Sequence, residues 1–173
     1  MRTLIRATLL LLVLMASTAA QSESTKIVAG ERIGPVVLGM AKNDLMRLLG
    51  RADRTYETVG QVGRRQTPFV FSTTYYYGAE SLGGHVWEVS VSSIPVPQVK
   101  NIKTTSSKYA TDHGIKVGSS GVKVVEAFGS QHKTNYLSGP LAGGVQLLYD
   151  HLGIGFILTK DNRVVAVQVW PRK

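Results

Sequence analysis

Histidine and acidic residues occur close together at three places in the chain, where they could bind a metal ion or transfer protons. His85 and Glu88 are three positions apart, and Asp-His pairs occur at 112–113 and 150–151. On a helix, a His-x-x-Glu spacing would bring both side chains to one metal ion. The residues around His85 instead alternate like a β-strand, in which positions three apart face opposite ways. We expect no metal site, and a hydrolase that uses one of the Asp-His pairs is a third alternative to the two functions considered below.

Glycine- and serine-rich segments and the lack of cysteine point away from several other kinds of site. The segment 118–121 (GSSG) has the wrong spacing for the Gly-x-Ser-x-Gly turn of serine hydrolases. The segment 139–144 (GPLAGG) lacks the Lys and Ser/Thr of a phosphate-binding loop and is expected to be a turn. With no Cys among its 173 residues, the chain has no disulfide, thiol nucleophile or Cys-bound metal. The sequence therefore predicts no enzyme, no catalytic residue and no cofactor.

Aromatic residues in strand-like segments are candidates for contact with another protein. Three tyrosines stand in a row at 75–77, and in a strand Tyr75 and Tyr77 share one face while Tyr76 takes the other. Tyrosine and tryptophan are common at interfaces because they bury apolar area while a polar atom still forms hydrogen bonds. In one alternative Tyr75 and Tyr77 fill the core. In the other, an open sheet face binds another exported or envelope protein through five residues: Tyr75, Tyr77, Glu88, Gln168 and Trp170.

The positive charge of the chain suggests an alternative function. It has 20 Lys and Arg against 11 Asp and Glu, a net charge of +9, which becomes +7 without Arg2 and Arg6. A cationic exported protein attracts anionic polymers of the cell envelope, or an acidic partner, over long distances. The alternative is therefore an electrostatic binder of such polymers, with four candidate residues: Arg51, Arg54, Arg64 and Arg65. A basic surface that is merely solvated also explains the charge, and nucleic acid is not expected as a partner.

The first 20 residues have the three-part layout of a secretory signal peptide. Arg2 and Arg6 are followed by the apolar run 9–15 and by the small residues 16–20. The apolar run is shorter than the roughly 18 residues that a membrane-spanning helix needs, and there is no Cys that could carry a lipid. We expect cleavage near Ala20 and a periplasmic or secreted protein without a membrane anchor.

One sequence pattern occurs twice and predicts how the chain is organised. Residues 36–50 align with residues 115–129 without a gap, at an offset of 79 positions. Each copy begins apolar-x-apolar-Gly, continues with apolar residues at i, i+3 and i+4, and ends in Gly. This pattern indicates two tandem units of similar structure.

The repeated spacing places its apolar residues on one face of a short helix. In the first copy these residues are Leu45, Leu48 and Leu49, and in the second they are Val124, Ala127 and Phe128. We expect helices at about 41–49 and 120–128, each ended by a glycine in a left-handed conformation. Ser120 can cap the second helix, whereas the matching Ala41 cannot cap the first. Helices of two turns are unstable alone and must pack on a sheet.

β-strands are expected after each helix, where aromatic and β-branched residues are bounded by Gly and Pro. The expected strands are at about 67–77 and 85–93 in the first unit, and at about 145–150, 153–159 and 163–170 in the second. The predicted organisation is a signal peptide at 1–20, repeat 1 at 21–94, a linker at 95–110 and repeat 2 at 111–173. The fold class is α+β, with both repeats forming one curved antiparallel sheet and both helices on one face.

Strand alternation predicts which side chains meet the helices. Trp87, Val89 and Val91 match Val165, Val167 and Val169 at an offset of 78, and these six are the core candidates. Gly153 and Gly155 leave one face of their strand nearly bare. Such a bare strip either lets another chain approach closely or accommodates a bend in the sheet.

The segment Ile33–Gly50 (IGPVVLGMAKNDLMRLLG), repeated more weakly at Gly114–Gly129 and followed by strands, resembles the β-lactamase-inhibitor-protein-like fold group. The small outer-membrane-assembly lipoproteins of the SmpA/OmlA (BamE-like) type are similar in the same helix-then-strands unit. The resemblance implies two tandem units that form one sheet, and a sheet face that binds another protein. The chain departs from both groups, because it lacks the disulfides of the inhibitors and the acylated Cys of the lipoproteins. Neither a β-lactamase target nor a role in the assembly machine is therefore carried over.

Overall fold

The structure, a computed structural model, describes residues 25–62, 67–78 and 86–173. Within these residues the fold is a mixture of two α-helices and two β-sheets, and strands predominate. The helices are α2 (Lys42–Leu49) and α3 (Gly121–Phe128), and a short 3-10 helix, η1, spans Gly139–Leu141. No helix in the described ranges is long and apolar enough to cross a membrane. The expected signal peptide at 1–20 lies outside the described residues.

The larger sheet has eight antiparallel strands in the order β4-β5-β6-β7-β12-β11-β10-β9. Its strands are β4 (Arg54–Val62), β5 (Thr67–Tyr77), β6 (Trp87–Ser92), β7 (Gln98–Thr104), β9 (Lys133–Tyr136), β10 (Val145–Tyr149), β11 (Ile154–Leu158) and β12 (Val164–Val169). The smaller sheet has the order β3-β2-β1-β8. Its strands are β1 (Lys26–Val28), β2 (Arg32–Ile33), β3 (Val36–Val37) and β8 (Ala110–Thr111).

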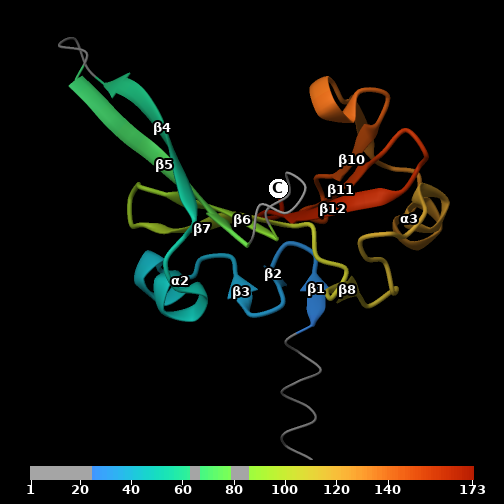
Figure 1. Cartoon of the computed structure of the whole chain (residues 1–173), viewed down its shortest axis with the longest axis horizontal. Helices are drawn as coiled ribbons and strands as arrows, with labels where there is room; N and C mark the ends of the chain where they lie inside the picture. The colour runs from blue at the N-terminus through green and yellow to red at the C-terminus, as the bar shows by residue number, and fades with distance from the viewer. Residues whose placement is uncertain (1–24, 63–66, 79–85) are drawn as a thin grey trace, which may run out of the picture.

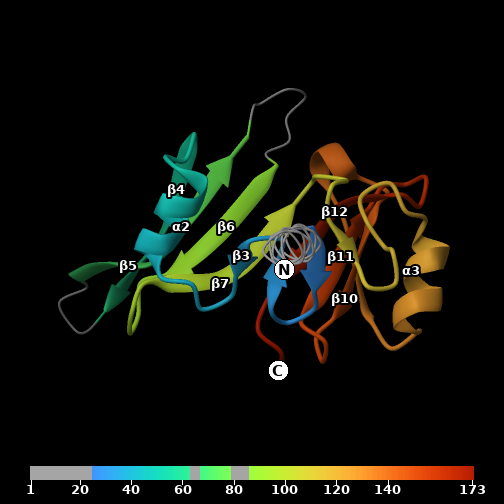
Figure 2. The same cartoon turned by 90° about the horizontal axis from the view of Figure 1, so that it is seen from below.

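Both helices and the smaller sheet cover one face of the larger sheet. Figure 1 shows α2, the smaller sheet and α3 beneath it, and Figure 2 shows from below that the helices lie at opposite ends. The two ends of the larger sheet rise above its middle, so its upper face is concave (Figure 1). We call this upper surface the concave face. The single sheet expected from the sequence is thus accompanied by a second one, whose strands of two or three residues are too short to show alternation.

The core lies between these two layers. Val89, Ile102 and Phe156 of the larger sheet are fully buried, and they belong to one apolar cluster with Ile27 of the smaller sheet and Leu45 of α2. Burial of a Val, Leu, Ile or Phe side chain stabilises a fold by roughly 1.5–3 kcal/mol. The helices and the short strands are therefore held mainly by packing on the larger sheet, since elements of this length are unstable in isolation.

The predicted strand alternation holds in β6 and shifts in β12. Trp87, Val89 and Val91 are buried as expected. In β12, Val167 and Val169 are buried, but Val165 is only partly so. A register irregularity in the pairing of β11 with β12 leaves Val165 without a partner, because a bulge offsets the alternation of the strand that contains it.

The ends of the two helices have the geometry that the sequence predicts. The Ser120 hydroxyl oxygen accepts the backbone N–H of Lys123 at 3.4 Å, whereas Ala41 has no side-chain cap. Gly50 and Gly129 end the helices with φ of 77° and 83°. Each glycine donates its backbone N–H to the carbonyl four residues earlier.

The buried face of α2 differs from the expected one at one position. Leu45 is fully buried and Leu49 packs against the core as expected, but Leu48 is 43% exposed, and Met46 packs against the core in its place. The Tyr77 hydroxyl donates to Met46 Sδ at 3.9 Å, so β5 meets the helix on the side of Met46. In α3, Val124 is buried as expected, and the Phe128 ring lies 5.1 Å from that of Phe156.

The pairing of β7 with β12 joins the two halves of the larger sheet. Its register brings Thr104, Lys103 and Ile102 opposite Val167, Gln168 and Val169. The expected linker at 95–110 therefore contains a full strand, and the prediction of a mere connection there is wrong. A bulge between Ser90 and Val91 in the pairing of β6 with β7 leaves Lys100 unpaired, which breaks the alternation that would have revealed the strand.

The outer strands of the larger sheet are β4 and β9. β4 carries a register irregularity at Thr58/Val59. All four residues of β9 are exposed, and Lys133 of β9 forms an ion pair with Asp150 at 2.6 Å. Neither outer strand was expected from the sequence, because exposed strands lack an alternating apolar pattern.

Replacing Ser120 with Ala should lower the free energy of unfolding by about 1 kcal/mol, because α3 loses the oxygen that accepts the Lys123 N–H. The reciprocal change Ala41→Ser should raise it by up to about 1 kcal/mol, since Ala41 already has the extended backbone of a capping residue. Urea unfolding followed by circular dichroism measures both changes. Unaltered stability of the Ser120→Ala protein would contradict the capping role.

Candidate functional site

One row of residues crosses the whole concave face. Strand pairing places eight residues opposite one another from β4 to β9: Arg54, Tyr76, Glu88, Lys103, Gln168, Gly155, Leu148 and Lys133. Directly paired residues share a face of the sheet. We call these eight the cross-sheet row. None of the described helices or strands lies over it (Figure 1).

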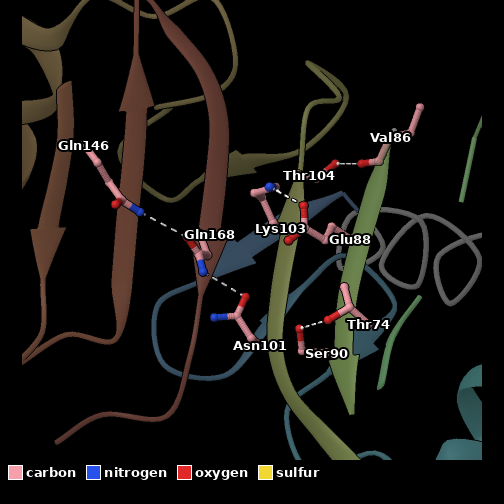
Figure 3. Close-up of polar contacts among 9 residues, drawn as sticks. All are labelled: Thr74, Val86, Glu88, Ser90, Asn101, Lys103, Thr104, Gln146 and Gln168. Atoms are coloured by element: carbon pink, nitrogen blue, oxygen red, sulfur yellow. Dashed lines mark hydrogen bonds and ion pairs between the residues drawn. The ribbon is translucent and has the colours of Figure 1, made fainter. Parts of the chain in front are cut away.

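Side-chain amides form a hydrogen-bonded chain along the middle of the concave face. Gln146 Nε2 donates to Gln168 Oε1 at 3.2 Å, and Gln168 Nε2 donates to Asn101 Oδ1 at 3.0 Å (Figure 3). The chain passes from β10 over β11 to β12 and β7. All three side chains are half-buried. Because the amides hold one another in place, less side-chain freedom remains to be lost when a partner binds.

Charged and phenolic groups continue the row toward β4. Lys103 forms an ion pair with Glu88 on the neighbouring strand (Figure 3), and the Arg54 guanidinium lies 4.7 Å from the centre of the Tyr76 ring. Burial raises the pKa of Tyr76, the Glu88 charge raises it further, and Arg54 partly opposes this. The Tyr76 phenol is therefore harder to ionise than an ordinary tyrosine.

Trp170 occupies the strip that Gly155 leaves open. A Cβ atom added to Gly155 would lie 2.8 Å from Trp170 Cη2 and 3.1 Å from Leu148 Cδ2. The expected bare strip on β11 is therefore covered by the chain's own indole, which remains half-exposed. The concave face thus has an apolar platform beside a row of amides.

Two of the five residues predicted to bind a partner lie on the opposite side of the sheet. Tyr75 and Tyr77 are only 4% and 6% exposed, because they pair with Val89 and Trp87, which face the core. Lys42 of α2 lies 5.8 Å from the centre of the Tyr75 ring, so the helix covers that ring. The exposed face of the tyrosine run is that of Tyr76, as the alternative interpretation held. Glu88, Gln168 and Trp170 do lie on the concave face.

The other candidate residues do not gather into one site. Arg51 and Arg54 are exposed before and at the start of β4, whereas Arg64, Arg65 and His85 lie outside the described residues. The carboxylates of the Asp-His pairs contact lysines, with Asp112 at 3.3 Å from Lys26 and Asp150 at 2.6 Å from Lys133. The hydrogen bond from Lys133 lowers the pKa of the Asp150 carboxyl. Among the described residues, no three His, Cys, Asp or Glu side chains are grouped to hold a metal ion.

Sequence reasoning missed three polar residues of the concave face. Asn101 and Lys103 were expected in a linker, and Gln146 was expected only as part of a strand. The apolar residues nearest to Asn101 and Lys103 are Val99 and Ile102. These two are three positions apart because of the bulge at Lys100, so strict alternation does not reveal the strand. Proximity of Gln146 to Gln168 depends on the strand order, which the sequence pattern does not specify.

No family model matches the chain, and it matches no curated protein. Solved structures with similar arrangements include a DUF4309 family protein (YjgB) from Bacillus subtilis, with 14% identity, a TM-score of 0.47, and coverage of 83% of this chain and 88% of that one. Another is the uncharacterized protein yfeY from Escherichia coli, with 12% identity, a TM-score of 0.45 and coverage of 84% and 99%. A third is an extracellular protein containing an SCP domain from Bacillus anthracis, with 10% identity, a TM-score of 0.46 and coverage of 78% and 44%.

Replacing Gly155 with Ala should displace Trp170 from the concave face, because the new Cβ would overlap the indole. Overpacking of this kind lowers the free energy of unfolding by about 1–3 kcal/mol. The displaced indole should fluoresce at longer wavelength as it becomes more solvated. The same change in a Trp170→Phe background is the control, since the remaining Trp87 should not respond. An unchanged spectrum in the parent background would show that Trp170 does not rest on Gly155.

Replacing Tyr75 with Ala should destabilise the protein by about 3–5 kcal/mol, as expected for loss of a buried aromatic ring. Trp170→Ala should cost less than half as much, because the indole is half-exposed. Urea unfolding of the two variants gives the comparison. Similar small losses for both would contradict the burial of Tyr75 beneath α2.

Proposed function

We propose that the protein is an exported, non-enzymatic binding module that contacts another exported or envelope protein with its concave face. The observation that carries the proposal is the half-exposed Trp170, held over Gly155 beside the Gln146–Gln168–Asn101 chain. Aromatic anchors surrounded by polar groups are typical of the centres of protein interfaces. Export is supported by the three-part layout of the first 20 residues.

The geometry of the concave face favours a partner with a convex, partly polar surface. The amide chain, the Glu88–Lys103 pair and the Thr74–Ser90 hydroxyl contact of 2.9 Å fix the side chains before binding. Glu88 and Lys103 already neutralise each other, so the middle of the face has little net charge. Affinity should then come from Trp170 and from hydrogen bonds to amides, and it should depend little on salt.

Two tandem repeats are part of the proposal. The segments α2-β4-β5-β6-β7 and α3-β9-β10-β11-β12 follow the same order, in which β7, and not β6 as the sequence pattern suggested, corresponds to β12. The bounds of the two helices differ by the same 79 positions as the sequence copies. The two sets of strands meet at β7 and β12. This arrangement supports the proposed relationship to the β-lactamase-inhibitor-like and SmpA/OmlA fold groups, but it names no target.

The absence of catalysis is likewise proposed from the placement of the candidate groups. The carboxylate of each Asp-His pair contacts a lysine, and the His113 ring instead packs edge-on against Phe128 at 5.5 Å. A hydrolytic triad needs the carboxylate to orient the imidazole and the imidazole to activate a nucleophile. These contacts support a structural role for the two pairs.

Trp170→Ala should weaken capture of the partner at least tenfold, since a central aromatic anchor commonly contributes 2 kcal/mol or more. The measurement is retention of envelope proteins on the immobilised protein, followed by titration of the retained species. Gln168→Ala should also weaken capture of the partner. Leu48→Ala is the matched control, because Leu48 is an exposed apolar residue on α2, on the other side of the sheet.

Unchanged capture by the Trp170→Ala protein would overturn the concave-face proposal. Retention that disappears at high salt, together with loss of binding in an Arg51→Gln/Arg54→Gln protein, would favour the alternative of anionic envelope polymers. Retention through a high-salt wash is the result expected for the concave face.

A further inference from the structure

A hollow separate from the concave face lies where the loop before α3 meets the turn between β11 and β12. It is a cavity of about 440 Å³. Its lining includes Lys116, Ser119, Ser120, Lys123 and Arg163. None of these residues belongs to the concave face, so the hollow is independent of the proposed protein-binding surface.

Three cationic side chains line this cavity without an acidic neighbour in its wall. Lys116, Lys123 and Arg163 contribute three positive charges, and the wall contains no Asp or Glu. Within residues 25–62, 67–78 and 86–173, the only ion pairs formed by lysine or arginine involve other residues. All three side chains are exposed, and an anion in the hollow would be attracted by their combined charge.

Two hydroxyl groups add hydrogen-bond donors to the same wall. Ser119 Oγ accepts the backbone N–H of Lys116 at 3.1 Å, and Ser120 Oγ accepts that of Lys123 at 3.4 Å. A hydroxyl has one proton to donate in addition to its acceptor sites. In the part of the chain that the structure describes, no acceptor receives either proton, so both are free to donate to a ligand.

The backbone of the hollow is fixed before any ligand arrives. Val164 donates its N–H to the Ser119 carbonyl at 2.9 Å, and Gly121 donates to the Asn162 carbonyl at 2.9 Å. The Arg163 guanidinium donates to the Gly118 carbonyl at 3.4 Å, which holds it against the wall. A site that is already ordered loses little conformational freedom on binding.

We propose that this hollow binds a phosphate group. A phosphate dianion balances most of the three charges, and its terminal oxygens can accept from the guanidinium, the two ammonium groups and both hydroxyls. A carboxylate has one charge and two oxygens and would leave donors unused. The phosphate could belong to a free phosphorylated compound or to a lipid with a phosphomonoester headgroup, such as phosphatidic acid, since the recognised group is then the same.

The test is a titration of the isotope-labelled protein with inorganic phosphate, followed by NMR at constant ionic strength. The backbone amides of residues 114–123 and 163 should shift in a saturable manner, and chloride at equal ionic strength should not shift them. The triple variant Lys116→Gln/Lys123→Gln/Arg163→Gln should bind phosphate more weakly, with a dissociation constant at least tenfold higher. The control Lys100→Gln/Lys108→Gln/Lys173→Gln removes the same charge from exposed positions elsewhere and should bind as the parent does.

Non-saturable shifts, or an equal loss in both triple variants, would overturn the site, because either result indicates attraction by net charge alone. Circular dichroism verifies that the variants are folded. Cosedimentation with phosphatidylcholine vesicles that contain phosphatidic acid, compared with phosphatidylcholine vesicles alone, separates the two sources. Selective cosedimentation that the site variant loses assigns the phosphate to a lipid headgroup, and binding of inorganic phosphate without it assigns a free compound.

Discussion

The antiparallel pairing of β7 with β12 is the constraint on which the rest of the structure depends. It makes two sets of four strands into one sheet, and every residue of this junction has a role on one of the two faces. Ile102, Val167 and Val169 face the core, where the smaller sheet packs. Asn101, Lys103 and Gln168 face the other way and supply the middle of the concave face. A slip of one residue would exchange these two sets and lose both core and face.

The concave face is organised by a missing side chain as much as by those present. At Gly155 the sheet surface is low enough for the Trp170 ring to lie over β11, and on the same face Gln146 of β10 donates a hydrogen bond to Gln168 of β12. The helices press on the other side of the same strands, so the apolar packing that orders the sheet also orders the polar side chains above it. The basic hollow before α3 is ordered differently, by backbone hydrogen bonds between a loop and a turn.

Sequence periodicity predicted the elements that local spacing controls. The two helices, the Ser120 cap, the glycine ends and the buried positions of β6 follow from side chains close together in the chain. The burial of Tyr75 and Tyr77 was not settled by sequence, because it depends on their pairing with Val89 and Trp87. β7 was missed because its bulge hides the alternation, and the basic hollow was missed because Lys116, Lys123 and Arg163 converge only through the fold. Contacts between distant segments therefore account for most of what sequence reasoning lacked.

The two outer strands of the larger sheet bear on how the protein behaves at high concentration. An exposed strand offers unpaired backbone groups to any other chain and can nucleate aggregation. β4 carries an irregularity at Thr58/Val59 that interrupts a flat pairing edge, and β9 has only four residues and begins with a lysine. Both features discourage a second molecule from extending the sheet. The sheet thus keeps two open edges that are poorly suited to pairing with a second molecule.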